Sequence, residues 1–90
     1  MARTERESPA ELTMDWPGTP SEDHSGEVAR LFVLNLIDAM GERSNRSVAD
    51  AAGISEATLR KTLAGASWPD LRTVSRLELA LNRKLYPGDN

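Results

Sequence analysis

The stretch SVADAAGISEATLRKTLAG, from Ser47 to Gly65, decides the fold of this chain. It is helical in character at both ends, but Gly53, Ile54 and Ser55 interrupt it at the centre. Glycine inside a helix costs about 1 kcal/mol relative to alanine, so its place here needs a structural cause. Glycine readily takes the positive φ that ends a helix, and serine is a favoured N-cap of the next one. The stretch therefore predicts two short helices joined by a tight turn.

The apolar residues around this turn fit two helices that cross at a wide angle. Ser44 is expected to cap a first helix over 45–52, in which the small Ala49 lets the second helix approach closely. Ile54 is expected to point from the turn into the core, and Leu59 and Leu63 to hold the second helix on the rest of the protein. Two helices joined by a turn of about 3–4 residues, often containing glycine, form a helix-turn-helix.

The rest of the chain from residue 26 onward is also expected to be helical. One helix should run from Glu27 to the C-cap Gly41, with an inner stripe formed by Ala29, Phe32, Val33, Leu36, Ile37 and Met40. A last helix, capped by Asp70, should carry Leu71, Val74, Leu77, Leu79, Ala80 and Leu81 on its apolar positions. Leu85, Tyr86 and Pro87 predict a short closing turn. Because no run alternates as a strand does, residues 26–90 predict an all-α fold, a small bundle of four to five short helices containing the helix-turn-helix.

Residues 1–25 differ from the rest in composition. They contain three prolines and few branched apolar side chains, with six acidic residues against two arginines, for a net charge of −4. Such a segment buries too little apolar surface to offset its ordering entropy, so we expect a disordered acidic tail. The exception is the segment around Trp16, where Leu12 and Met14 add apolar surface that can dock on the body or on a protein partner.

Several classes of protein are excluded by composition. The chain has no cysteine and a single histidine, His24, so we expect no disulfide, no metal site and no cofactor. No apolar run reaches the roughly 18 residues of a membrane span, and the N-terminus lacks a signal core, which predicts a cytoplasmic protein. Carboxylates are scattered and no glycine-rich phosphate loop occurs, so we do not expect an enzyme.

Positive charge gathers where the predicted helix-turn-helix lies. The whole chain has a net charge of −3, yet residues 43–76 carry six basic against three acidic residues. In DNA-binding proteins of this motif, the second helix enters the major groove with its early residues on the base edges. The expected base-reading residues are Glu56, Ala57, Thr58 and Arg60, and the expected phosphate ligands are Arg43, Asn45, Arg46, Lys61 and Arg72.

Residues from about 30 to 86 resemble the helix-turn-helix domain of the Cro/repressor-type (XRE-like) transcriptional regulators, a lambda-repressor-like fold. The likeness rests on these residues: Ser44, Val48-Ala49, Ala52-Gly53-Ile54-Ser55, Leu59, Leu63-Ala64-Gly65, Trp68-Pro69-Asp70-Leu71, Leu77 and Ala80-Leu81. The C-terminal part, with Leu85-Tyr86-Pro87, is similar to actinobacterial members. The resemblance implies a sequence-specific regulator that binds double-stranded DNA as a symmetric dimer. The candidate dimer contacts are Val28, Leu31 and Leu34, which are apolar but lie off the inner stripe.

Two other functions fit the same residues. A small DNA-binding chain with an acidic tail also suits the antitoxin of a toxin–antitoxin pair, with the tail wrapped on the toxin. Alternatively, the scaffold is a protein-interaction module that does not bind DNA, because its negative balance keeps nucleic acid away. In that case the partner would be bound by Val28, Leu31, Leu34 and Trp16.

Overall fold

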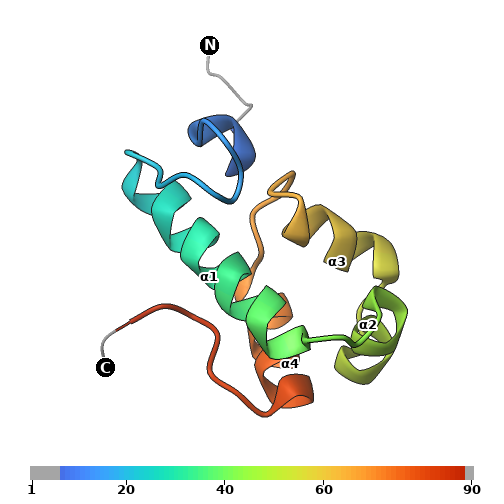
Figure 1. The fold of residues 1–90 in the computed structure, drawn as a ribbon. Coiled ribbons are helices and arrows are strands. Elements are labelled where there is room, and N and C mark those ends of the chain that lie inside the picture. Colours follow the sequence, from blue (N-terminus) through green and yellow to red (C-terminus); the bar gives the residue numbers. More distant parts are fainter. Residues whose placement is uncertain (1–6, 89–90) are drawn as a thin grey trace.

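The structure, a computed structural model, describes residues 7–88 of the 90-residue chain. Its order is a 3-10 turn η1 (Ala10–Leu12) and then the α-helices α1 (His24–Met40), α2 (Asn45–Ala52), α3 (Glu56–Leu63) and α4 (Leu71–Leu81). Figure 1 shows α1 crossing the molecule, with α2 and α3 to one side and α4 behind its C-terminal half. The Cα radius of gyration is 13.0 Å, as expected for a compact chain of this size. Across the described residues, the predicted all-α class is confirmed, since four α-helices and no strand are present.

Helix α1 starts at His24, before the predicted Glu27, because Asp23 supplies its N-cap and accepts the Gly26 N–H at 2.8 Å. Its inner stripe is buried as predicted, with one correction. Ile37 is 46% exposed and does not belong to the core. At 3.6 residues per turn, Ile37 lies about 80° around the helix from Ala29, at the margin of the stripe rather than within it. The predicted cap Gly41 ends the helix with φ of 56°.

The core lies where α1, α2 and α3 meet α4. Its fully buried side chains are Phe32, Val33, Leu36, Val48, Leu59, Leu77 and Leu85. Two leucines predicted on the apolar positions of α4 are outside it, since Leu71 is 82% and Leu79 is 83% exposed. Leu79 is two positions from the buried Leu77, and side chains two apart on a helix face different ways. No helix among residues 7–88 is both long enough and apolar enough to cross a membrane.

The closing turn predicted at Leu85, Tyr86 and Pro87 is not helical, and side chains of α1 and α4 hold it in place. The Glu78 carboxylate accepts the backbone N–H groups of Leu85 and Tyr86 at 2.7 and 2.9 Å, and Asn35 donates to the Leu85 carbonyl at 2.9 Å. The two backbone donors lower the pKa of Glu78. Leu85 is thereby fixed in the core, with no solvent exposure.

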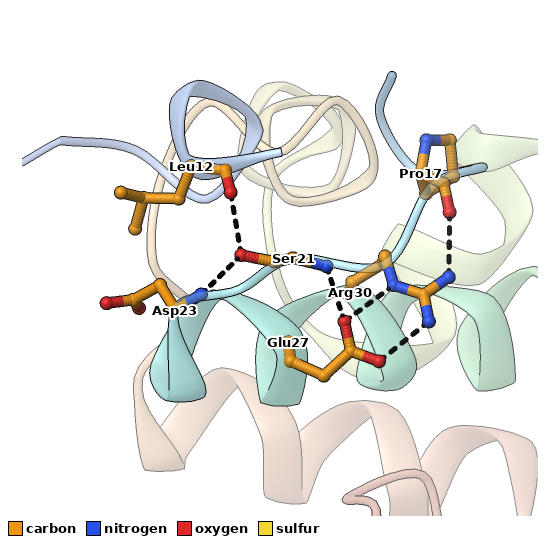
Figure 2. Close-up of polar contacts among 6 residues, drawn as sticks. All are labelled: Leu12, Pro17, Ser21, Asp23, Glu27 and Arg30. Atoms are coloured by element: carbon orange, nitrogen blue, oxygen red, sulfur yellow. Dashed lines mark hydrogen bonds and ion pairs between the residues drawn. The ribbon is translucent and has the colours of Figure 1, made fainter. Parts of the chain in front are cut away.

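Residues 7–23 form an arm that packs on the helices, which differs from the disordered tail expected from composition. The Arg30 guanidinium binds both carboxylate oxygens of Glu27, at 2.9 and 2.7 Å, and donates to the Pro17 carbonyl at 3.2 Å (Figure 2). Glu27 also accepts the Ser21 N–H at 2.8 Å, and the Ser21 hydroxyl donates to the Leu12 carbonyl at 2.6 Å. These contacts tie the arm to the first turns of α1. Residues 1–6 of the predicted tail lie outside the described residues.

The other anchor of the arm is the turn between α3 and α4. The Trp16 indole N–H donates to the Leu63 carbonyl at 2.9 Å, and the Ala10 N–H donates to the Gly65 carbonyl at 2.9 Å. Farther along the turn, the Trp68 indole N–H donates to the Glu7 carbonyl at 2.9 Å. Trp16 therefore packs on the body of the protein, which is one of the two docking places expected for it.

Candidate nucleic-acid interface

The turn between α2 and α3 is built by local rules. The Ser44 hydroxyl caps α2 by accepting the Ser47 N–H at 3.0 Å. Gly53 ends that helix in the left-handed conformation, with φ of 72° and ψ of 32°, where a Cβ is strained. The Ile54 N–H then donates to the Ala49 carbonyl at 3.0 Å, and the Ile54 side chain packs against the core. The predicted helix ends and the predicted apolar contact of the turn are thus confirmed.

Ser55 caps α3 and engages Thr58 twice. Its hydroxyl oxygen accepts the Thr58 backbone N–H at 3.0 Å, and its O–H donates to the Thr58 hydroxyl at 2.8 Å. Because the Thr58 oxygen accepts in this pair, its own O–H proton is left to donate elsewhere. Thr58 is exposed, so its hydroxyl is accessible to a ligand from solvent.

Helix α3 has one buried and one exposed face. Leu59 and Thr62 are buried, and the Thr62 hydroxyl is satisfied by the Thr58 carbonyl at 3.0 Å. The exposed side chains are Glu56, Ala57, Thr58, Arg60 and Lys61. All four residues predicted to read bases, and the predicted phosphate ligand Lys61, therefore lie on one solvent-facing surface, which we call the α3 face.

Two of the predicted base-reading residues are joined to each other. Arg60 lies 3.3 Å from the Glu56 carboxylate, one helical turn earlier. Their side chains are 57% and 44% exposed, respectively. An exposed pair with this spacing stabilises a helix by only about 0.3–0.5 kcal/mol. A ligand with a stronger acceptor can therefore take Arg60 from Glu56 at small cost.

The remaining predicted phosphate ligands lie at two helix starts. Arg43 and Arg46 are exposed and Asn45 is half-buried, all at the beginning of α2. Arg72 is exposed in the first turn of α4. Within residues 7–88, no side-chain hydrogen bond or ion pair joins the group at α2 to the α3 face. Arg72, in contrast, shares a recess with a residue of that face.

This recess lies between the α2–α3 turn and the first turns of α4, with a volume of about 420 Å³. We call it the turn recess, and its lining residues are Gly53, Ile54, Ser55, Thr58, Asp70, Arg72, Thr73 and Arg76. Arg76 donates from Nη1 to the Gly53 carbonyl at 3.1 Å. The sequence does not predict this bond, since nothing local signals a contact with a residue 23 positions away.

One carboxylate also lies at the turn recess. Asp70 caps α4, as predicted, by accepting the Thr73 N–H at 2.8 Å. This backbone donor, with the Thr73 hydroxyl and the charge of Arg72, lowers the pKa of Asp70. Asp70 therefore stays ionised at neutral pH, and its negative charge partly offsets the two arginines.

The predicted dimer residues are only partly available. Val28 and Leu31 are half-buried, whereas Leu34 is 37% exposed. Val28 lines an apolar recess of about 240 Å³ together with Phe32, Trp68 and Val74, so part of its surface faces its own chain.

No family model, curated protein or solved structure gives a significant match to this chain.

Proposed function

We propose that this protein is a sequence-specific DNA-binding transcriptional regulator. In this proposal α2, the turn at Gly53 and α3 act as a helix-turn-helix, with α3 in the major groove. The single observation that supports it most is the division of α3. Leu59 and Thr62 are buried, while every residue that the motif would direct at bases is exposed. An eight-residue helix capped by Ser55 is short enough to present its N-terminal turns to a groove about 12 Å wide.

The residue types on the α3 face suit the edges of base pairs. Arg60, once released from Glu56, can donate two hydrogen bonds to O6 and N7 of a guanine, which gives about 1–3 kcal/mol of discrimination. Glu56 can accept from a cytosine amino group, and the small side chains of Ala57 and Thr58 can contact a thymine methyl. Lys61, a flexible point charge, suits a backbone phosphate better than a base.

The affinity is proposed to come mainly from phosphate contacts. Arg43, Asn45 and Arg46 at the start of α2 and Arg72 at the start of α4 would supply them, together with Lys61. With roughly four contacts per subunit, the plot of log K against log salt concentration should have a slope of about −3 to −4 per subunit.

Selection of bound fragments from genomic DNA tests this function directly. The purified full chain should enrich a defined sequence, and its affinity for that sequence should fall with salt at the expected slope. Arg60→Gln should relax the preference at one base pair, while Lys61→Gln should weaken binding to all sequences alike. Arg83→Gln is the matched charge control, because Arg83 pairs with Asp38 at the far end of α4 from the turn recess. Enrichment of no sequence, with no salt-sensitive binding to any duplex, would refute the proposal.

A protein-interaction module is the second candidate, and the exposed leucines favour it. Leu71 and Leu79 are more than four-fifths exposed on α4, where regular surface helices carry polar groups. If the chain binds no DNA, substitution of these two leucines by glutamine should abolish recovery of a partner while the fold is kept. The dimer implied by the family resemblance stays a prediction, which sedimentation of the free and the DNA-bound protein would test.

A further inference from the structure

Two arginines, Arg72 and Arg76, line the turn recess, and only one of the two has a bonded partner among residues 7–88. Arg76 uses one of the five N–H groups of its guanidinium to donate to the Gly53 carbonyl. Arg72 is exposed and has no hydrogen bond or ion pair from its side chain within that range. The turn recess therefore gathers more hydrogen-bond donors than the protein itself uses.

A third donor reaches the turn recess from α3. The Thr58 hydroxyl accepts from Ser55 at 2.8 Å, which leaves its proton free to donate. Thr58 also belongs to the α3 face. The turn recess is thus continuous with the surface proposed to contact base edges. Because two guanidinium groups and a hydroxyl come together there, the complementary ligand is an anion with several acceptor oxygens.

We propose that the turn recess binds a phosphate group, and that a backbone phosphate of double-stranded DNA supplies it when α3 is in the major groove. This proposal rests on the proposed function. Arg72 binds the phosphate as an exposed guanidinium. Arg76 does two things at once, since it binds the phosphate and holds the Gly53 carbonyl, and it thereby couples backbone contact to the position of α3.

The charge of Asp70 gives the proposal a distinctive test. A carboxylate beside a bound phosphate repels it, although the same carboxylate caps α4 through the Thr73 N–H. Asparagine caps a helix about as well as aspartate but carries no charge. Asp70→Asn should therefore tighten DNA binding by about two- to tenfold at low salt without unfolding α4. A purely structural turn recess predicts no such gain.

The experiment has two arms that separate the possible sources of phosphate. In the first, inorganic phosphate is added to the labelled full chain, and the backbone amide signals of Gly53, Thr58 and Thr73 are followed by NMR. In the second, the salt dependence of DNA binding is compared among the wild type, Arg72→Gln, Arg76→Gln and the control Arg83→Gln. Arg76→Lys keeps the positive charge but loses the forked hydrogen-bond donor. Its comparison with Arg76→Gln shows whether an effect comes from the lost charge or from a displaced turn.

Support for the proposal requires three results. Phosphate must shift the amide signals, Arg72→Gln and Arg76→Gln must each make the salt slope about 0.9 less steep, and Arg83→Gln must leave it unchanged. If the wild type binds DNA and the slopes of all variants agree, the turn recess is no phosphate site although the proposed function stands. If phosphate shifts the signals but the wild type binds no duplex, DNA as the source and the proposed function both fail. If neither ligand has an effect, both proposals are overturned.

Discussion

The arm over residues 7–23 and the α2–α3 unit owe their conformations to different kinds of contact. The helix ends and the turn of the α2–α3 unit are set by hydrogen bonds between residues a few positions apart in sequence, such as the bond from the Thr58 N–H to the Ser55 hydroxyl. The arm has only the short η1 as secondary structure and is held by hydrogen bonds to residues far along the chain, such as the bond from the Trp16 indole N–H to the Leu63 carbonyl, 47 positions away. Local sequence rules therefore predict one region and miss the other.

The two regions meet at Gly65, where the largest effect on stability is expected. Gly65 and Gly53 have similar positive φ values, of 69° and 72°. A Cβ on Gly65 would lie 2.5 Å from the Trp16 ring, whereas one on Gly53 would meet only Nη1 of Arg76, at 2.8 Å and at the far end of a long side chain. Gly53→Ala should thus lower the free energy of unfolding by about 1–2 kcal/mol for the backbone alone. Gly65→Ala should cost about 1–3 kcal/mol more, because the indole must move.

Urea denaturation of the two variants, with and without Trp16→Ala, measures this difference. In the Trp16→Ala background the excess cost of Gly65→Ala should disappear, since no ring remains to be displaced. An excess that persists there would show that Gly65 is constrained by its backbone alone and that the arm does not pack as described.

The next effect concerns pH and belongs to the arm. The hydrogen bonds from Arg30, followed by that from the Ser21 N–H, lower the pKa of Glu27 to about 2. A carboxylate with a lowered pKa in the folded protein stabilises it above its ordinary pKa, near 4.5, and this contribution is lost as pH falls toward 2. The arm should therefore loosen between these values.

The signal of the Trp16 indole N–H in NMR spectra recorded from pH 6 to pH 2 reports this loosening. Glu27→Gln is the control, because it should release the arm already at neutral pH and remove most of the acid dependence. Asp70 and Glu78 also have lowered pKa values, but they lie at α4 and not at the arm. If wild type and Glu27→Gln lose the Trp16 signal at the same pH, Glu27 does not hold the arm.

A smaller effect is expected at the cap of α3. Ser55→Ala removes the acceptor of the Thr58 N–H and should lower the free energy of unfolding by about 1 kcal/mol, while Ser55→Asn should restore most of it. Thermal unfolding of both variants measures the difference. If Ser55→Ala unfolded at the same temperature as the wild type, the side-chain cap would add nothing and the contacts of Leu59 would position the helix.

Features that depend on local contacts were predicted from the sequence, and features that depend on distant contacts were mostly not. Ser44, Gly53, Ser55 and Asp70 act as predicted because a cap or a left-handed glycine depends on neighbours that the sequence displays directly. Apart from the apolar segment around Trp16, composition gave no sign that residues 7–23 pack, because long-range hydrogen bonds such as those of Trp16 and Arg30 hold much of the arm. The bond from Arg76 to Gly53 was missed for the same reason.

Burial on a single helix was also only partly predictable. An apolar residue at helical spacing indicates a face but not how far its partners extend, so Ile37, Leu71 and Leu79 were assigned to apolar faces and are exposed. For the candidate site, the side chains that the sequence predicts on the α3 face are all exposed, and their role in binding stays a prediction. The sequence did not indicate the turn recess, because that recess exists only where α4 returns to the α2–α3 turn.

The smallest effect is expected for the ion pair on α3, and it contrasts with the pair that holds the arm. Both pairs join a glutamate to an arginine within one turn of a helix. The Arg30 side chain is only 10% exposed and also donates to the Pro17 carbonyl. The Arg60 side chain is 57% exposed, and Glu56 is its one ion-pair partner among the described residues. Arg60→Gln should therefore change the free energy of unfolding by less than about 0.5 kcal/mol.

Arg30→Gln, measured by the same urea denaturation, should destabilise the protein more than Arg60→Gln, because the Glu27 carboxylate and the Pro17 carbonyl lose their donor together. The order of the two losses separates the two kinds of ion pair. A pair that does little for folding can open for a ligand, and a pair that closes the arm cannot. If Arg60→Gln proved the more costly change, the α3 face would be a structural surface, and Arg60 would be a poor choice for reading a base.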